Sequence, residues 1–172
     1  MKGIKGRFLA LVVGAALLLS AATATMAAQV SADSLKSDIA SFLDERAGEF
    51  ASVADAIWSY AELGFQEFKS SEVLIKLFEK YGFSIEKNVS GIPTAFIATW
   101  GSGSPVIGFT GEYDALPGLS QKTVPQKEPA VAGAPGHGCG HNILGTTGAA
   151  GAIALKAAME KSGAAGTVKF FG

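Results

Sequence analysis

Residues 106–118 read VIGFTGEYDALPG and place a short apolar strand directly before a cluster of polar side chains. The first five residues show little alternation of polar and apolar side chains, which is typical of a central strand buried on both faces. Glu112 and Asp114 follow two residues apart, so an extended chain points them to the same side. Because ligands of open α/β sheets bind beyond the carboxyl ends of the strands, we expect this junction to border a functional site.

The sequence on either side of this stretch predicts the rest of the fold. Three apolar stripes with helical spacing lie between residues 35 and 82, followed by β-favouring segments at residues 83–89 and 94–100. Residues 142–161 are rich in small and apolar side chains and predict a helix, and residues 167–171 predict a last strand. A strand, a helix and another strand in succession predict an α/β sheet with at least one parallel pair.

The single cysteine and both histidines of the chain fall within residues 136–142, GHGCGHN. Thiolate and imidazole are suitable ligands for zinc and related metals, and in an extended segment Cys139 and His141 point to the same side. The spacing therefore indicates a metal site. The alternative is a glycine-rich loop with a buried thiol and two solvated imidazoles.

Asp114 is the second candidate for a functional residue. A carboxylate directly after a strand can ligate a metal or orient a ligating imidazole through its second ring nitrogen. The alternative is a turn or N-cap aspartate before Pro117. We expect two further carboxylates, Glu62 and Glu67, to be solvated on the surface.

Several other catalytic classes lack their motifs. The chain has no G-x-S-x-G nucleophile elbow and no Walker loop, and its glycines at 136, 138 and 140 do not fit G-x-G-x-x-G. A thiol hydrolase stays open, with Cys139 as nucleophile and His141 or His137 as base. The net charge is −1, and no basic stripe is present, so nucleic acid is not expected as a partner.

The N-terminus resembles a secretory signal. Basic residues occur before position 8, an apolar run of about a dozen residues follows, and ATA at residues 22–24 fits a cleavage site, with cleavage after Ala27 or Ala28 as the alternative. We expect residues 1–28 to be a signal peptide and residues 29–172 to be secreted or periplasmic, with no stable membrane span after cleavage. The alternative is an uncleaved membrane anchor. A single cysteine excludes an intrachain disulfide in the exported part.

Two longer strings resemble a known family. GEYDALPGLS at residues 111–120 and GAPGHGCGHN at residues 133–142 are similar to the aspartate and Cys-x-His motifs of metal-dependent amidohydrolases related to aminoacylases and carboxypeptidases. The nearest branch is that of the aminobenzoyl-glutamate utilisation proteins. The resemblance covers roughly residues 33–172.

This resemblance implies a function and a fold. Cys139 and His141 would be ligands of one or two divalent ions, manganese or zinc, and Asp114 the active-site aspartate. The substrate would be a small N-acyl or aminobenzoyl amino acid, and the full-length enzyme a homo- or hetero-oligomer. The fold would be part of a zinc-peptidase-like three-layer α/β/α catalytic domain.

Family members are longer, and their remaining strands, inserted dimerisation domain and further ligands have no counterpart in these 172 residues. We therefore expect the chain alone to be inactive, with an open sheet edge at residues 167–171. An exported domain that binds a metal or ligand without turnover is the alternative. The roles of Glu112 and His137 stay open.

Overall fold

A computed structural model describes residues 31–172, of which Leu35–Gly172 form one unit. The expected signal peptide, its cleavage site and the boundary at residue 29 lie outside the described residues. Among residues 31–172, no helix is both long and apolar enough to span a bilayer.

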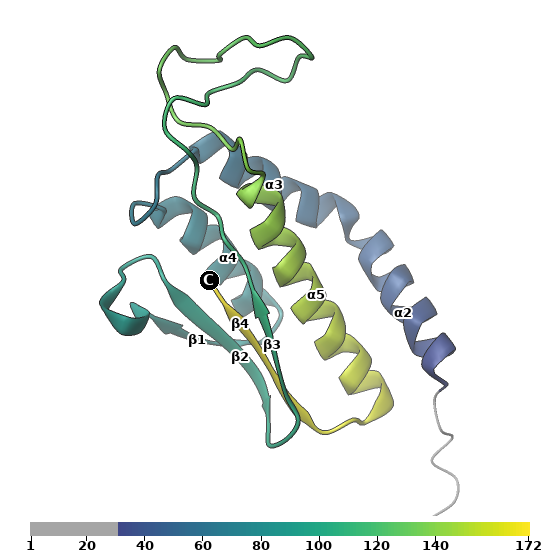
Figure 1. Ribbon diagram of the computed structural model, residues 1–172. Coiled ribbons are helices and arrows are strands. Elements are labelled where there is room, and N and C mark those ends of the chain that lie inside the picture. Colours follow the sequence, from purple (N-terminus) through teal and green to yellow (C-terminus); the bar gives the residue numbers. More distant parts are fainter. Residues whose placement is uncertain (1–30) are drawn as a thin grey trace, which may run out of the picture. The chain divides into compact units, whose positions relative to one another are not determined.

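The described elements follow the order that the sequence predicts (Figure 1). Three helices come first, then three strands, a long helix and a fourth strand. Their bounds are α2 (Ala32–Glu45), α3 (Ala47–Tyr60), α4 (Phe68–Lys80), β1 (Ser84–Lys87), η1 (Val89–Gly91), β2 (Phe96–Ser102), β3 (Val106–Thr110), α5 (His141–Ser162) and β4 (Gly166–Phe171).

The four strands form one mixed sheet in the order β1-β2-β4-β3. β1 pairs antiparallel with β2, β2 pairs antiparallel with β4, and β3 pairs parallel with β4. Helix α5 connects the parallel pair, with Ile107 opposite Val168 and Phe109 opposite Phe170. The expected α/β class and the expected parallel pair are therefore confirmed.

Two expectations about the sheet edges are wrong. The sequence predicts β3 at the centre, but it forms an edge of the described sheet, and Val106 and Ile107 are 59% and 40% exposed. The sequence also predicts β4 at an open edge, but β4 lies between β2 and β3 and pairs with both. An apolar run without alternation identifies a strand, whereas its place in the sheet depends on partners far away in the chain.

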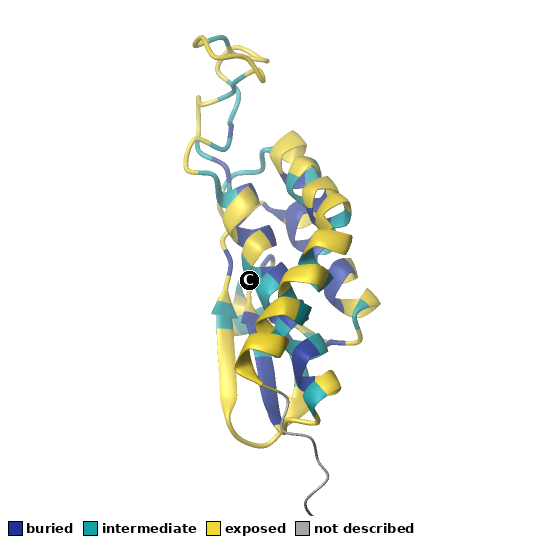
Figure 2. Cartoon of the chain, turned by 90° about the vertical axis from the view of Figure 1, so that its right-hand side faces the viewer, coloured by how far each residue is buried: buried dark blue, intermediate teal, exposed yellow. Residues whose placement is uncertain are grey.

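One face of the sheet carries the core. Phe96 and Ala98 of β2 and Val168 and Phe170 of β4 are buried in a cluster with Phe78 of α4. The centroid of the Phe78 ring lies 5.0 Å from that of Phe83, 6.1 Å from that of Phe96 and 4.8 Å from that of Phe170. α4 packs on β1 and β2, and α5 packs on β3 and β4. Figure 2 shows the exposed residues on the outer turns of the helices and in the loop before α5.

Small residues let α5 approach the end of β3 closely. A Cβ atom on Gly145 would lie 2.6 Å from the carbonyl oxygen of Glu112, and one on Gly148 would lie 2.8 Å from that of Thr110. Glycine removes these clashes, so the first turn of α5 packs directly against the chain that follows β3. This contact brings the Cys/His segment beside the carboxylates.

Candidate metal centre

Glu112, Tyr113 and Asp114 continue the extended course of β3 beyond its last paired residue. Backbone contacts with the chain after α3 hold the end of this segment, because the amide of Ala115 donates a 2.7 Å hydrogen bond to the carbonyl of Glu62. Leu63 and Ala115 form an isolated parallel bridge. Tyr113 is buried, whereas Glu112 and Asp114 point away from it, as alternation along an extended chain requires. The two carboxylates therefore share one side.

His141, the first residue of α5, lies between these two carboxylates. Its Nδ1 is 2.7 Å from Oδ1 of Asp114, and its Nε2 is 3.2 Å from Oε2 of Glu112. A carboxylate only accepts hydrogen bonds, so Nδ1 carries the proton that Asp114 binds. The His141 side chain is only 16% exposed, whereas that of Glu112 is 67% exposed. Asp114 thus fixes the ring, and Nε2 points to the open side.

A hairpin-like loop joins Asp114 to the Cys/His segment. Leu116 and Gly136 exchange two backbone hydrogen bonds of 3.0 Å, and the amide of Ser120 donates to the carbonyl of Ala134. A Cβ atom on Gly136 would lie 2.1 Å from the carbonyl oxygen of Leu119, so only glycine fits where the two arms meet. The loop therefore starts and ends at the site.

Two side chains fasten the segment 137–142 to α3. His137 donates from Nε2 to the carbonyl of Ile57 at 3.0 Å, and Asn142 donates to the carbonyl of Ala54 at 3.3 Å. Burial lowers the pKa of His137 below its ordinary value, which favours the neutral ring. Both flanks of the Cys/His segment are therefore anchored on the same helix.

Cys139 is an exposed free thiol. The extended conformation expected between Cys139 and His141 is absent, because Gly140 has a φ of 79° and His141 already belongs to α5. Within residues 31–172, no group of three or more His, Cys, Asp or Glu side chains is arranged as a complete metal site. The structure thus brings Asp114 and His141 together but does not join Cys139 to them.

The donors at His141 fit a divalent ion. Nε2 lies 3.2 Å from a carboxylate oxygen of Glu112, and a neutral ring with its proton on Nδ1 would offer the Nε2 lone pair to a cation at this point. Zinc bonds to nitrogen and oxygen are about 2.0–2.2 Å long, so two ligand atoms of one tetrahedral or octahedral ion lie about 3–3.5 Å apart. The 3.2 Å between Nε2 and Oε2 falls in this range. Imidazole and carboxylate are also the ligand types that zinc and manganese accept.

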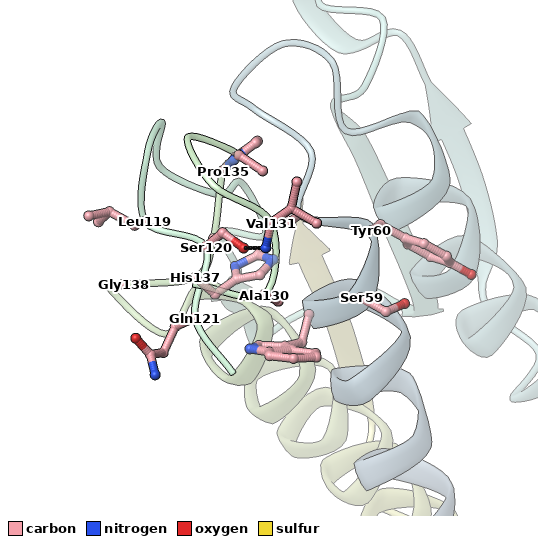
Figure 3. A pocket seen from close by; sticks show the side chains of 14 residues that line it. Ser59, Tyr60, Leu119, Ser120, Gln121, Ala130, Val131, Pro135, His137 and Gly138 are labelled. Carbon is pink, nitrogen blue, oxygen red and sulfur yellow. Dashed lines mark hydrogen bonds between the residues drawn. The ribbon is translucent and has the colours of Figure 1, made fainter. Parts of the chain in front are cut away.

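A cavity of about 430 Å³ is lined by residues directly before Cys139 in the chain, whereas Glu112, Asp114 and His141 do not line it (Figure 3). Its walls come from the end of α3, including Trp58, and from the hairpin, where Ser120 accepts a 3.1 Å hydrogen bond from the amide of Val131. His137 and Gly138 also line it, directly before Cys139 in the chain. An apolar ligand group in this cavity would therefore lie next to the Cys/His segment.

Three carboxylates differ from what the sequence predicts. Glu62 is predicted to be solvated on the surface, but it is half-buried, and its carboxylate accepts hydrogen bonds from the amides of Lys69 and Ser70 and from the Ser70 hydroxyl. The contact of Glu112 with Nε2 of His141 is not among the predicted interactions, although its position two residues before Asp114 is a usable signal. Glu67 is predicted on the surface, but it is only 8% exposed and accepts a hydrogen bond from Thr94. Its flanking phenylalanines give no clear indication of burial, because Phe65 and Phe68 are themselves exposed.

Comparisons with known proteins identify relatives for most of the described part. The chain is 49% identical over 124 residues to a subunit of the p-aminobenzoyl-glutamate hydrolase of Escherichia coli strain K12, covering 72% of this chain and 26% of that protein. It is 33% identical over 146 residues to the Xaa-Arg dipeptidase of Mus musculus, covering 78% and 30%. No family model matches the chain.

A solved structure agrees with these relatives. The Bacillus subtilis YXEP protein, a dinuclear metal binding peptidase from the M20 family, superposes with a TM-score of 0.52 at 26% identity. The match covers 71% of this chain and 34% of that one. The chain therefore spans about a quarter to a third of the length of these relatives.

Proposed function

We propose that this chain, which belongs to the M20 family of peptidases and amidohydrolases, supplies part of the metal centre of an enzyme that hydrolyses an amide bond in an N-acyl or aminobenzoyl amino acid. The observation that carries the proposal is His141 held between Asp114 and Glu112, with Nε2 on the open side. The superposition on a dinuclear metal binding peptidase supports a metal-dependent activity for this fold.

His141 and Cys139 are the proposed ligands of one or two divalent ions, zinc or manganese. A bound ion of this kind polarises the scissile carbonyl and lowers the pKa of a water molecule toward neutrality. Asp114 accepts the Nδ1 proton of His141, which keeps the Nε2 lone pair available and the ring in one orientation. Glu112 adds negative charge on the side where the cation binds.

The substrate class follows from what two relatives have in common. One is named for p-aminobenzoyl-glutamate and the other for Xaa-Arg dipeptides, and both compounds contain an amide to the nitrogen of an amino acid. The apolar walls beside Trp58 suit the acyl or aminobenzoyl half of such a substrate. Which amino acid leaves depends on residues that recognise its side chain.

The hydrogen bonds of the two histidines argue against the thiol hydrolase. His141 uses its ring nitrogens on Asp114 and Glu112, and His137 uses Nε2 on Ile57. In this structure Cys139 is exposed and has neither ring positioned as its general base. No observation favours binding without turnover over hydrolysis.

The proposal extends to the assembly, activity and location of the chain. The Escherichia coli relative is named as one subunit of its hydrolase, so we propose that the complete enzyme is an oligomer, either with copies of itself or with a different chain.

A catalytic zinc usually has three protein ligands, and His137 already donates to Ile57. We therefore propose that residues 29–172 alone show no detectable amide hydrolysis. We also propose export after cleavage near residue 28, which N-terminal sequencing of the mature protein tests.

Cobalt binding tests the metal centre. Co²⁺ added to the purified chain is expected to give the absorption bands of a thiolate and imidazole site, with one thiolate charge-transfer band that is lost in Cys139→Ser. His141→Ala is expected to weaken binding at least tenfold. Absence of binding by the wild-type chain contradicts the proposal. Turnover of p-aminobenzoyl-glutamate that survives chelators and leaves an acyl group on Cys139 would instead establish the thiol hydrolase.

A further inference from the structure

Tyr113 separates the two carboxylates that hold His141, and its side chain is anchored on the opposite side of the chain. The residue is 5% exposed, and its ring stacks on Phe96 with the centroids 6.3 Å apart. Its hydroxyl donates a short hydrogen bond to the backbone carbonyl of Thr94. Any shift of Tyr113 therefore moves both Glu112 and Asp114, because the three residues are consecutive.

Thr94 continues the network to α4. Its hydroxyl donates to Oε2 of Glu67 at 2.7 Å, and both residues are buried, with exposed fractions of 4% and 8%. Glu67 is the residue before α4, and its backbone carbonyl accepts the amide of Ser71 at 2.8 Å. Glu67, Thr94 and Tyr113 thus join the start of α4, the segment before β2 and the extension of β3.

We propose that the buried network Glu67–Thr94–Tyr113 is a positioning device that sets Asp114 and Glu112 at hydrogen-bonding distance from His141. The inference rests on the function proposed above, in which His141 is a metal ligand. Successive side chains of an extended chain point to opposite sides, so Tyr113 points toward the network while Glu112 and Asp114 point toward His141. A cavity of about 300 Å³ lies at the same place and is lined by Glu67, Thr94, Tyr113 and both carboxylates.

The charges in the network support a fixed arrangement. A buried carboxylate needs hydrogen-bond donors, and the Thr94 hydroxyl supplies one to Glu67. Burial, with a contribution from the negative charge of Glu67, raises the pKa of Tyr113 far above its ordinary value. The raised pKa favours the protonated phenol, which is the form that donates to the carbonyl of Thr94.

Three substitutions separate positioning from simple stability. Tyr113→Phe removes the hydroxyl that reaches Thr94, and Thr94→Val removes the hydroxyl that reaches Glu67. Thr94→Ser keeps that hydroxyl and is the conservative rescue. Phe83→Leu is the matched control, because Phe83 is buried against Phe78 and does not line the 300 Å³ cavity.

Two measurements on the full chain provide the readouts. The first is the Nδ1 proton of His141 in the metal-free protein, observed by NMR, because a proton held between imidazole and carboxylate is protected from exchange with water. The second is the Co²⁺ dissociation constant together with the absorption spectrum. Thermal unfolding of each variant gives the loss of stability against which both are compared.

We expect Tyr113→Phe and Thr94→Val to speed exchange of the His141 Nδ1 proton with water. Both substitutions should also raise the Co²⁺ dissociation constant by about tenfold, which is a typical loss of affinity when residues that orient a metal ligand are changed. The Co²⁺ dissociation constant of Thr94→Ser should stay within about twofold of the wild-type value. Phe83→Leu should lower the melting temperature but alter neither the exchange rate of the His141 proton nor the Co²⁺ dissociation constant. The inference is overturned if Tyr113→Phe and Thr94→Val behave like Phe83→Leu. A wild-type chain that binds no Co²⁺ contradicts the proposed function, while the exchange measurement still decides the positioning role.

Discussion

His141 contacts a carboxylate through each ring nitrogen, and the two contacts have different consequences. The bond to Asp114 is 2.7 Å long and fixes both the ring orientation and the protonated nitrogen. The contact with Glu112 is longer, at 3.2 Å, and involves a side chain that is mostly exposed. Asp114 therefore orients the ring, and Glu112 lies on the exposed side of Nε2.

Asp114→Asn is expected to weaken metal binding by about 10- to 100-fold, because an amide is a weaker acceptor for the Nδ1 proton and leaves the ring less firmly oriented. Isothermal titration with Zn²⁺ measures the effect. Asp55→Asn is the matched control, since Asp55 is exposed on α3. Equal affinities for Asp114→Asn and the control would show that Asp114 does not act on the metal ligand.

The contact between α5 and the extension of β3 decides where His141 lies. It depends on the absence of a side chain at Gly145, whose Cβ position is 2.6 Å from the carbonyl oxygen of Glu112. An alanine normally favours a helix by about 1 kcal/mol over glycine. Here the overlap with the backbone exceeds that gain, so α5 must move away from the strand.

Gly145→Ala is expected to destabilise the fold by about 1–3 kcal/mol, the usual cost of overpacking, and to weaken Co²⁺ binding. Gly48→Ala in α3 is the control, because a Cβ atom there meets nothing within 4 Å. That change should leave stability equal or raise it by about 0.5 kcal/mol. Urea unfolding of both variants provides the comparison, and a stabilised Gly145→Ala would disprove the close approach.

An ion pair between α3 and α4 gives a pH-dependent contribution to stability. Lys80 donates to Oε1 of Glu49 at 2.6 Å, and the Tyr81 hydroxyl donates to Oε2 at 3.0 Å. The hydrogen bond from Lys80, opposed by desolvation and aided by Tyr81, lowers the pKa of Glu49 in the folded state. A lowered pKa means that the unfolded chain binds the proton more readily.

The contribution of Glu49 is therefore present above its ordinary pKa and disappears as the pH falls through the lowered value. We expect Glu49→Gln to lower the melting temperature slightly at pH 7, because exposed ion pairs contribute little. At a pH near 3 the difference from wild type should shrink. A difference that stays constant with pH would exclude ionisation of Glu49 as its cause.

Across the whole described sheet, β3 presents an edge with apolar side chains. Val106 and Ile107 are 59% and 40% exposed, and one side of the strand has no partner among residues 31–172. Unpaired strand edges favour association with other chains. The sequence predicts this hazard at residues 167–171, but β4 is paired on both sides.

Val106→Lys is expected to reduce self-association of the chain, with little change in melting temperature because the side chain is exposed. Sedimentation velocity over a range of concentrations measures it. Val131→Lys is the control, since Val131 is 63% exposed in the hairpin and receives the same charge away from the edge. If both variants reduce association equally, net charge rather than the strand edge is responsible.

Local patterns in the sequence were enough to predict the elements and two of the residues that meet at the candidate site. Helical periodicity, β-favouring composition and short apolar runs are local, and they identified the helices from residue 35 onward, the four strands and the parallel β3–β4 pair joined by α5. The strings around Asp114 and His141 identified the two residues that the structure brings into contact. The family followed from the same strings.

The strand order, the contacts of His141 and the burial of Glu67 instead follow from tertiary packing. β4 lies between β2 and β3 because its Val168 and Phe170 complete a core with residues from α4 and β2, which are distant in the sequence. His141 reaches Glu112 because Gly145 allows α5 to pack against the backbone there. Such contacts depend on shape across the whole core, and local patterns of polarity carry no information about it.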